Sequence, residues 1–410
     1  MHIDIEHQRD YELFCQQKLQ DPYPLFHELR RKQPILWCEP LNTWLGFRYD
    51  DTLAAVKDPR FLSGRAGVYD TVLQGPDHKK ARALVDHLSM WMQSVNPPRH
   101  TRLRKLAGIA FAPRMIKDRV PRIAQIIHQR LEVVRQKGRC DFVHEFCYWV
   151  PAAVICDMLG LPQSDHERFR DWVADLMPFS SGAGAALVDA LQPAYDAMQG
   201  LLGYFQDAIG QRRSRPRDDL ISALVHAEEN GDRLTDSELF GLCVFLFVAG
   251  HETTSSLLAS GTYLLLNRPG QWRRLDPHDA PSVHRAIEEF LRYESPVTRA
   301  PRVAREDLQL HGRLIRTGQA VTFLLGAANR DPDQFPDPDR FDIDRGPNKH
   351  LAFGFGRHFC IGAELARLEA SIAFPMIFKQ LATLRLDGDQ VRWRAAFGVR
   401  ALEALPVAVD

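Results

Sequence analysis

A long apolar helix in the second half of the chain constrains the fold more than any other feature of the sequence. Thr235-Asp236-Ser237-Glu238 is a capping box, with Thr at the N-cap and Glu three residues into the helix. The helical pattern continues to Asn267, where Arg268-Pro269-Gly270 ends it, which gives a length of about 50 Å. Because the segment from Leu239 to Ala249 is apolar on nearly all sides, we expect the helix to cross the protein interior.

The middle of this helix carries residues that a buried helix does not need: Gly250, His251, Glu252, Thr253 and Thr254. Glycine costs about 1 kcal/mol relative to alanine inside a helix, and a buried acid is unfavourable unless it is paired. One interpretation is a polar contact between helices. The other is a kinked or widened turn that holds an acid and an alcohol for proton transfer.

A second unusual stretch is a glycine-rich loop, from Phe353 to Gly362, that contains Cys360. Strong helix formers follow the loop, so the cysteine lies at or just before a helix N-terminus, where free N–H groups and the helix dipole favour a thiolate. The glycines allow the backbone to turn tightly and a large flat group to approach. This pattern suits a soft metal ligand, whereas a lone cysteine can also be a small buried apolar residue.

Composition excludes several classes of protein. The 410 residues are 45% apolar, and 52 Lys and Arg balance 52 Asp and Glu, so global charge favours neither nucleic acid nor a membrane surface as partner. The seven cysteines are scattered and form no C-x-x-C, which argues against a disulfide framework or a closed zinc site. The N-terminus is polar, so we expect no signal peptide, no membrane anchor and a cytoplasmic location.

The remaining pattern predicts a mainly α protein with small β-sheets (α+β). Residues 35–38 and 43–47 read as a β-hairpin, and residues 60–95 as a long, partly irregular connection. We expect a single domain over residues 1–410. Its helix-rich part covers about 97–293, its β-containing parts about 30–60 and 296–328, and the cysteine loop with its helix about 351–381.

Residues 99–119 hold seven Lys or Arg against one acid, Asp118, in a chain of zero net charge. One interpretation is a solvated basic face. The other is a docking surface for an acidic partner, with inward arginines that hold an anionic cofactor group. Glu289 and Arg292 lie on one face of a later helix and can form a buried ion pair, although most such pairs lie on the surface.

Taken together, these motifs resemble the soluble bacterial cytochrome P450 family of heme-thiolate mono-oxygenases, and the match extends from about residue 20 onward. The resemblance implies the cytochrome P450 fold, with heme b (iron protoporphyrin IX) between the long central helix and the cysteine-loop helix. The matching residues, in chain order, are Pro97, Pro98, His100 and Arg104; Ala249, Gly250, Glu252, Thr253 and Thr254; Glu289 and Arg292; Pro338, Arg340 and Phe341; Phe353, Gly356, His358, Cys360 and Gly362; and Ala366, Arg367 and Glu369.

The resemblance also implies roles on the cysteine side of the heme. Cys360 would be the thiolate ligand of the iron, with Phe353 and Gly354 packed beside it. Four residues match the contacts of the heme propionates: His100, Arg104, Arg302 and His358. A buried network that fixes the segment 329–345 behind the heme would consist of Glu289, Arg292 and Arg340.

On the other side of the heme, the resemblance implies three catalytic residues. Gly250 would make room for O2, Thr253 would hydrogen-bond the oxygen being reduced, and Glu252 would relay protons from solvent. The expected substrate pocket is formed by Phe245, Val248, Ala249, Val297, Arg299 and Phe397, together with residues 60–95 and a small-residue stretch near 177–186 that is either a mobile lid or a plain loop. Arg299 is a candidate anchor for a polar substrate group, or else a structural arginine.

The expected activity is insertion of one oxygen atom from O2 into a lipophilic small molecule, by hydroxylation or epoxidation, in secondary metabolism. Electrons would come from NAD(P)H through a separate reductase and an acidic ferredoxin. We expect a monomer that binds neither nucleic acid nor membrane. Two alternatives stay open: a heme-binding scaffold or carrier without turnover, and an enzyme driven by peroxide.

Overall fold

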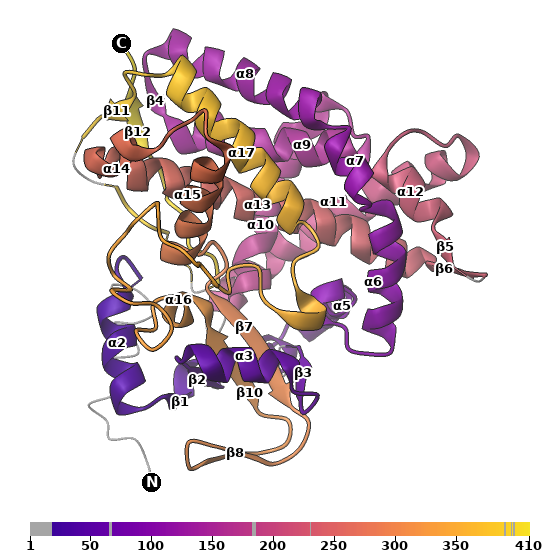
Figure 1. Cartoon of the computed structure of the whole chain (residues 1–410). Helices are drawn as coiled ribbons and strands as arrows, with labels where there is room; N and C mark the ends of the chain where they lie inside the picture. The colour runs from indigo at the N-terminus through magenta and orange to yellow at the C-terminus, as the bar shows by residue number, and fades with distance from the viewer. Residues whose placement is uncertain are drawn as a thin grey trace.

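Helices form most of the molecule, and a small sheet lies at one end (Figure 1). The computed structural model describes residues 19–64, 68–182, 186–229, 231–388, 391–394, 396 and 398–410. Within them, the α-helices are α2 (Tyr23–Lys32), α3 (Tyr49–Lys57), α4 (Asp70–Leu73), α5 (His78–Ser89), α6 (Arg99–Ala110), α7 (Pro113–Lys117), α8 (Val120–Lys137), α9 (Trp149–Leu159), α10 (His166–Ser181), α11 (Ala186–Ser214), α12 (Leu220–His226), α13 (Asp236–Leu266), α14 (Pro269–Arg274), α15 (Ala280–Tyr293), α16 (Leu325–Ala328) and α17 (Ala363–Gln380). The prediction of a mainly α protein with small sheets is confirmed.

The largest sheet has the strand order β1-β2-β10-β7-β3, in which β10 runs parallel to β2 and the other neighbours are antiparallel. The strands of the described residues are β1 (Ile35–Cys38), β2 (Thr43–Gly46), β3 (Phe61–Ser63), β4 (Arg139–Asp141), β5 (Glu228–Glu229), β6 (Asp232–Arg233), β7 (Arg299–Ala304), β8 (Leu308–Leu310), β9 (Arg313–Ile315), β10 (Ala320–Leu324), β11 (Arg385–Leu386) and β12 (Pro406–Ala408).

The predicted hairpin is confirmed in place. Strand β1 pairs with β2 from Ile35 opposite Gly46 to Cys38 opposite Thr43. The connection between them is a short 3-10 helix, Glu39–Leu41, that ends at Asn42 with φ of 48°. Asparagine tolerates this left-handed conformation better than most residues, which explains why the turn forms there.

Helix α13 begins and ends where the sequence predicts. The Thr235 hydroxyl accepts from the N–H of Glu238, and the Glu238 carboxylate accepts from the N–H of Thr235, so both halves of the capping box form. The helix is α-helical throughout, so the widened turn of one of the two interpretations does not form around Gly250. Among the described residues it alone is long and apolar enough to cross a membrane, yet 83% of its most apolar window is buried inside the protein. It is therefore the core helix.

The structure corrects the prediction for residues 60–95, which contain more regular structure than we expected. Helix α5 covers His78–Ser89 and buries Ala81, Leu84 and Leu88. These three residues follow a helical spacing, which the many charged neighbours hide in the sequence. Strand β3 and the 3-10 turn Met92–Ser94 lie on either side of it.

The position of α13 gives the fold its functional arrangement. It packs against α9, α11, α15 and α17, so it lies at the centre of the helical part of the molecule (Figure 1). The loop that precedes α17 carries Cys360 and contacts α3 through the short turn Gly356–His358. The polar middle of α13 and the cysteine loop contribute residues to one shared cavity.

The capping box provides a test of how α13 is anchored. We expect Thr235→Ala to lower the free energy of unfolding by about 1 kcal/mol, because the N–H of Glu238 loses its acceptor. Thr235→Asn keeps an acceptor at the N-cap and should stay close to the unchanged protein. Urea denaturation measures both, and equal stabilities for the two variants would contradict this account.

Candidate functional site

A cavity of about 370 Å³ lies between α13 and the cysteine loop. Every candidate residue predicted for catalysis and cofactor binding lines it: Gly250, Glu252, Thr253, Cys360, His100, Arg104, Arg302, His358, Phe353 and Gly354. These residues come from four parts of the chain that are distant in sequence. The structure therefore brings together the set that the sequence could only assemble by resemblance.

The cysteine loop has the tight geometry that its glycines predict. Gly354 and Gly356 have φ of 68° and 65°, a conformation that strains any residue with a side chain. The N–H of Cys360 donates to the carbonyl of Phe353 at 2.9 Å, which closes the loop. Cys360 lies just before α17, and its half-buried side chain faces the cavity.

The electrostatics of Cys360 differ from our expectation of a preformed thiolate. Burial raises the pKa of the thiol, while the N–H of Gly362 and the cations Arg104 and Arg367 lower it. Burial wins because a charge near the apolar cavity wall loses most of its hydration. The loop stabilises a thiolate only in part, and a bound cation would have to complete that stabilisation.

Arg367 belongs to a small, half-buried group behind the loop that the sequence analysis did not find. Its guanidinium lies over the ring of Phe353, 4.4 Å from the centroid, and donates to both oxygens of Glu288 at 2.7 and 2.8 Å. His350 contacts the same carboxylate at 3.1 Å. Burial opposes ionisation of Glu288, but the two partners together lower its pKa to about 2. This group fixes Phe353 beside the cysteine.

One edge of the cavity collects cationic and imidazole groups. The rings of His100 and His358 are 4.0 Å apart, and both nitrogens of His100 are buried without a hydrogen-bond partner among the described residues. Burial and the neighbouring cations lower the pKa of His358 to about 3 and that of Arg302 to about 10. Within the described part of the chain, none of these groups or Arg104 forms an ion pair with a carboxylate. This edge is complementary to an anionic ligand.

On the α13 side, the alcohol and glycine have clear local roles. The hydroxyl of Thr253 donates to the carbonyl of Ala249 at 2.8 Å, and its side chain lines the cavity. A Cβ at Gly250 would lie 3.3 Å from Ile155 of α9. The glycine is thus also needed for the close approach of these two helices, beyond the room for O2 that we expected it to provide.

Glu252 is buried, and only one of its two carboxylate oxygens has a hydrogen-bond partner among the described residues. Its Oε1 accepts from the guanidinium of Arg394 at 2.8 Å, while Oε2 has no partner among the described residues. Burial raises the pKa of Glu252, and Arg394 partly offsets this. Its neighbour His251 is fully buried against Tyr148, and burial lowers its pKa to about 3. His251 is therefore neutral.

The predicted substrate pocket is placed for all but one residue. Phe245, Val248, Ala249, Val297 and Arg299 line the cavity, whereas Phe397 lies outside the described residues. The predicted lid is only partly described, and its first residues belong to α10, which extends to Ser181. Lining residues that the sequence analysis did not name singly are Trp91, Met92, Ile155, Leu291 and Val399. Trp91 packs against Phe245 at a centroid distance of 5.8 Å.

The buried ion network is confirmed in part and corrected in one member. Arg292 donates to both oxygens of Glu289 at 2.7 and 2.8 Å, and neither side chain is exposed. The predicted third member, Arg340, is 65% exposed and pairs with Asp342. Arg345 takes its place, 3.3 Å from Glu289 and bonded to the carbonyl of Arg340. The chain turns there so that only the backbone of Arg340 faces inward.

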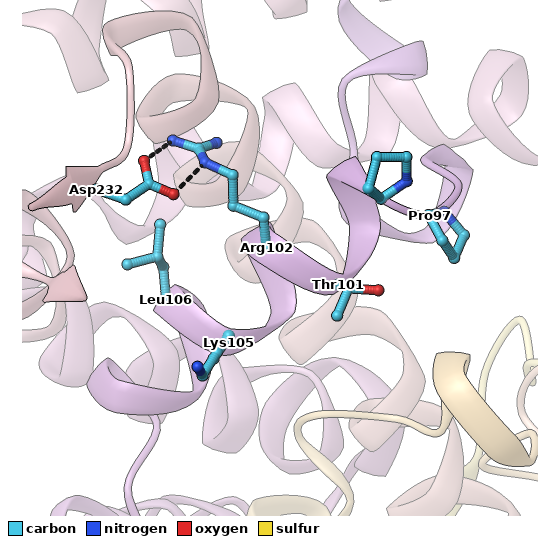
Figure 2. Close-up of a pocket in the computed structure, with 7 residues that line it drawn as sticks. Pro97, Thr101, Arg102, Lys105, Leu106 and Asp232 are labelled. Carbon is cyan, nitrogen blue, oxygen red and sulfur yellow. Dashed lines mark hydrogen bonds and ion pairs between the residues drawn. The ribbon is translucent and has the colours of Figure 1, made fainter. Parts of the chain in front are cut away.

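The basic run at 99–119 is not a free cationic surface. Arg102 donates to Asp232 of β6 at 2.6 and 2.8 Å (Figure 2). It also donates to Glu238 at 2.8 Å, which ties α6 to the start of α13. Other members of the run also have acidic partners: Arg99 with Glu238, Arg114 with Asp118, and Arg119 with Asp157 and Asp218. The run is thus partly neutralised by its own neighbours, which favours its interpretation as a solvated basic face over a docking surface.

Comparisons with known proteins agree on the family. The chain matches the family model "Cytochrome P450" over residues 75–392. The biotin biosynthesis cytochrome P450 of Bacillus subtilis (strain 168) is 37% identical over 396 residues, covering 96% of this chain and 97% of its own. The mycinamicin IV hydroxylase/epoxidase of Micromonospora griseorubida is 37% identical over 393 residues, covering 93% and 94%. The solved structure of P450BioI with acyl carrier protein ligated to hexadec-9Z-enoic acid has a TM-score of 0.88 at 35% identity, covering 97% and 100%.

The chain belongs to the cytochrome P450 family and has its fold. It is therefore a mono-oxygenase, an oxidoreductase that uses heme and O2. The residues present fit this cofactor: Cys360 offers a soft donor to iron on one wall of the cavity, and the cationic edge with the unpartnered His100 suits the two carboxylates of a heme.

The network contains Arg345 in place of the predicted Arg340, and this difference can be tested directly. We expect Arg345→Ala to lower the free energy of unfolding by about 2–3 kcal/mol, because it removes a buried partner of Glu289 and three carbonyl contacts. Arg340→Ala should change it by no more than about 0.5 kcal/mol, since that side chain is exposed. Urea unfolding of both variants decides, and the reverse order would refute the corrected network.

Proposed function

We propose that this protein inserts one oxygen atom from O2 into a C–H or C=C bond of a lipophilic small molecule. One oxygen atom goes to the substrate and the other leaves as water, which consumes two electrons and two protons. The observation that carries this proposal is a single cavity with Cys360 on one wall and the Glu252–Thr253 pair on the other. A scaffold that only carries heme has no use for a buried acid beside a cavity-lining alcohol.

In this proposal, the residues on the cysteine side hold the cofactor. Cys360 is the iron ligand, and the group of Glu288, Arg367 and Phe353 keeps the loop in place around it. His100, Arg104, Arg302 and His358 bind the heme carboxylates. When bound, the heme supplies O2 binding and reduction. Glu289 and Arg292 act only on stability, because they are enclosed away from the cavity.

On the α13 side, Thr253 and Glu252 control protons. The Thr253 hydroxyl, now bonded to Ala249, can turn to donate toward O2 within the same cavity. Glu252 is close to Thr253 in sequence and reaches solvent through Arg394. With this acid–alcohol pair intact, we favour turnover driven by electrons over turnover driven by peroxide.

We propose that electrons come from NAD(P)H through a separate reductase and a ferredoxin-like donor, and that the enzyme is a cytoplasmic monomer that binds no membrane. Because the basic run is partly neutralised, we assign donor docking to the cysteine-loop face instead. Phe355 and Phe359 are 43% and 38% exposed there, next to the exposed Arg357 and to Lys57, which lies over the Phe355 ring. An acidic protein with an apolar centre fits this face.

Relatives of the chain support the substrate class but do not narrow it. The names of these relatives refer to biotin biosynthesis, polyketide biosynthesis, mycinamicin IV and vitamin D3 hydroxylation. In this chain, the apolar cavity wall formed by Phe245, Trp91, Met92 and Val297 suits a lipophilic substrate. We accordingly propose a role in secondary metabolism, with Arg299 as the polar group that orients the substrate.

The assignment of Cys360 is tested by the spectrum of the reduced protein with carbon monoxide. A thiolate ligand gives a red-shifted Soret band, which we expect in the unchanged protein and in Cys140→Ser, whose cysteine lies on β4 outside the cavity lining. Cys360→Ala should abolish the band. Persistence of the band in that variant would rule out Cys360 as the ligand, and its absence from the unchanged protein would refute the proposed function.

The role of Thr253 can be tested with a control threonine from the same helix. We expect Thr253→Ala to divert electrons from product to hydrogen peroxide by roughly tenfold, because a positioned proton donor contributes at least about that much. Thr262→Ala is the matched control, since Thr262 makes the same 2.8 Å bond to the carbonyl four residues earlier but lies outside the cavity lining. Product and peroxide per NAD(P)H are measured, and equal ratios in both variants would contradict the role.

A further inference from the structure

The pair formed by Glu252 and Arg394 joins two segments 142 residues apart. Glu252 is only 8% exposed, and one of its oxygens has no partner among the described residues. Arg394 comes from the C-terminal segment, and its side chain is 40% exposed. A buried acid beside the cavity thus has one hydrogen-bonded contact, and that contact extends into water.

The C-terminal segment is fastened so that Arg394 has a defined position. The N–H of Arg394 donates to the carbonyl of Ala401 at 2.8 Å, next to the bridge between Trp393 and Leu402. The hydroxyl of Ser256, one turn after Glu252 on α13, donates to the carbonyl of Arg400. A segment anchored to the same helix presents Arg394 to Glu252 without the entropy cost of a free surface chain.

The other groups around Glu252 cannot take over this role. Tyr148 feels the charges of Glu252, Arg394, Arg170 and Asp171, but burial raises its pKa far above the physiological range. His251 is enclosed and neutral. Among the described residues, Arg394 is the one charged group that both bonds Glu252 and reaches solvent.

We propose that Arg394 is a positioning residue for the oxygenation reaction, which favours the ionised form of Glu252 against the effect of burial and makes this pair the point where protons pass from solvent to the cavity. The inference rests on the proposed function of the cavity. Its physical basis has two parts. A buried carboxylate without a partner tends to take up a proton and become neutral. An acid without a route to water cannot take up a new proton from solvent after it has donated its own. Arg394 satisfies one oxygen and leaves the other free to move a proton.

The test compares Arg394→Gln with Arg392→Gln in the heme-loaded protein. Arg392 lies two residues earlier in the same segment, and its ion pair with Glu403 is on the surface, with side chains 77% and 47% exposed. The first readout is the infrared band of the neutral carboxyl group in difference spectra after photolysis of carbon monoxide, assigned to Glu252 by its loss in Glu252→Gln. We expect this band to grow in Arg394→Gln and to stay at the unchanged level in Arg392→Gln.

The second readout separates proton supply from structure. Electron-driven turnover of Arg394→Gln should yield about tenfold less product per NAD(P)H, with peroxide released instead. This loss is smaller than the roughly 10²–10⁴-fold that a positioned acid itself contributes, because Arg394 acts only through Glu252. Turnover supported by added hydrogen peroxide should be unchanged, because peroxide already carries both electrons and both protons. Arg394→Lys, which keeps the charge, should restore most of the electron-driven yield.

Three results would overturn the proposal. The first is that Arg394→Gln matches Arg392→Gln in both the infrared band and the product yield. The second is that Arg394→Gln loses peroxide-supported turnover as much as electron-driven turnover, which would show that the arginine only holds the C-terminal segment. The third is growth of the neutral-carboxyl band of Glu252 in Arg394→Lys, which keeps the positive charge. This result decides the question if Arg394→Gln does not fold. Failure of the proposed function is seen separately, as a missing thiolate Soret band in the unchanged protein.

Discussion

The enclosed ion pair of Glu289 and Arg292 is the interaction on which the rest of the site depends. Both side chains are fully buried, and Arg292 also donates to the carbonyls of Asn329 and Pro338. It therefore joins α15 to the irregular segment that leads into the cysteine loop. Such a pair is retained only with nearly all of its hydrogen bonds made, since removing one partner leaves a buried charge. The path of residues 329–351, and with it the position of Cys360, follows from this requirement.

Local sequence rules predicted those parts of the fold in which neighbouring residues determine the structure. The capping box at Thr235, the turn at Asn42 and the left-handed glycines before Cys360 are examples, because each depends on residues only a few positions apart. Helix α5 was missed although its buried residues follow a helical spacing. Its charged residues dominate the composition, and only tertiary packing shows which face is buried.

Residues that meet across long distances could not be predicted in the same way. The arginine that completes the Glu289 network is Arg345, not Arg340, and the choice depends on how the chain turns between them. The contact of Arg394 with Glu252 spans 142 residues and corresponds to no motif. The partial neutralisation of the basic run likewise depends on β6 and α13, whose approach to α6 is not visible in a linear stretch of positive charges.

Three buried acids show how the number of hydrogen-bond partners distinguishes a structural carboxylate from one that can transfer a proton. Glu289 is saturated by Arg292, Arg345, Asn348 and a backbone N–H, so it has no oxygen left for exchange. Glu369 on α17 has an oxygen without a partner among the described residues, and burial raises its pKa well above the ordinary value, which disfavours the charged form. Glu252 lies between these limits: one oxygen is held by a cation that reaches water, and the other has no partner in the described part of the chain. Among these three acids, this arrangement is the one that fits the proposed role, in which a carboxyl group loses and regains a proton during turnover.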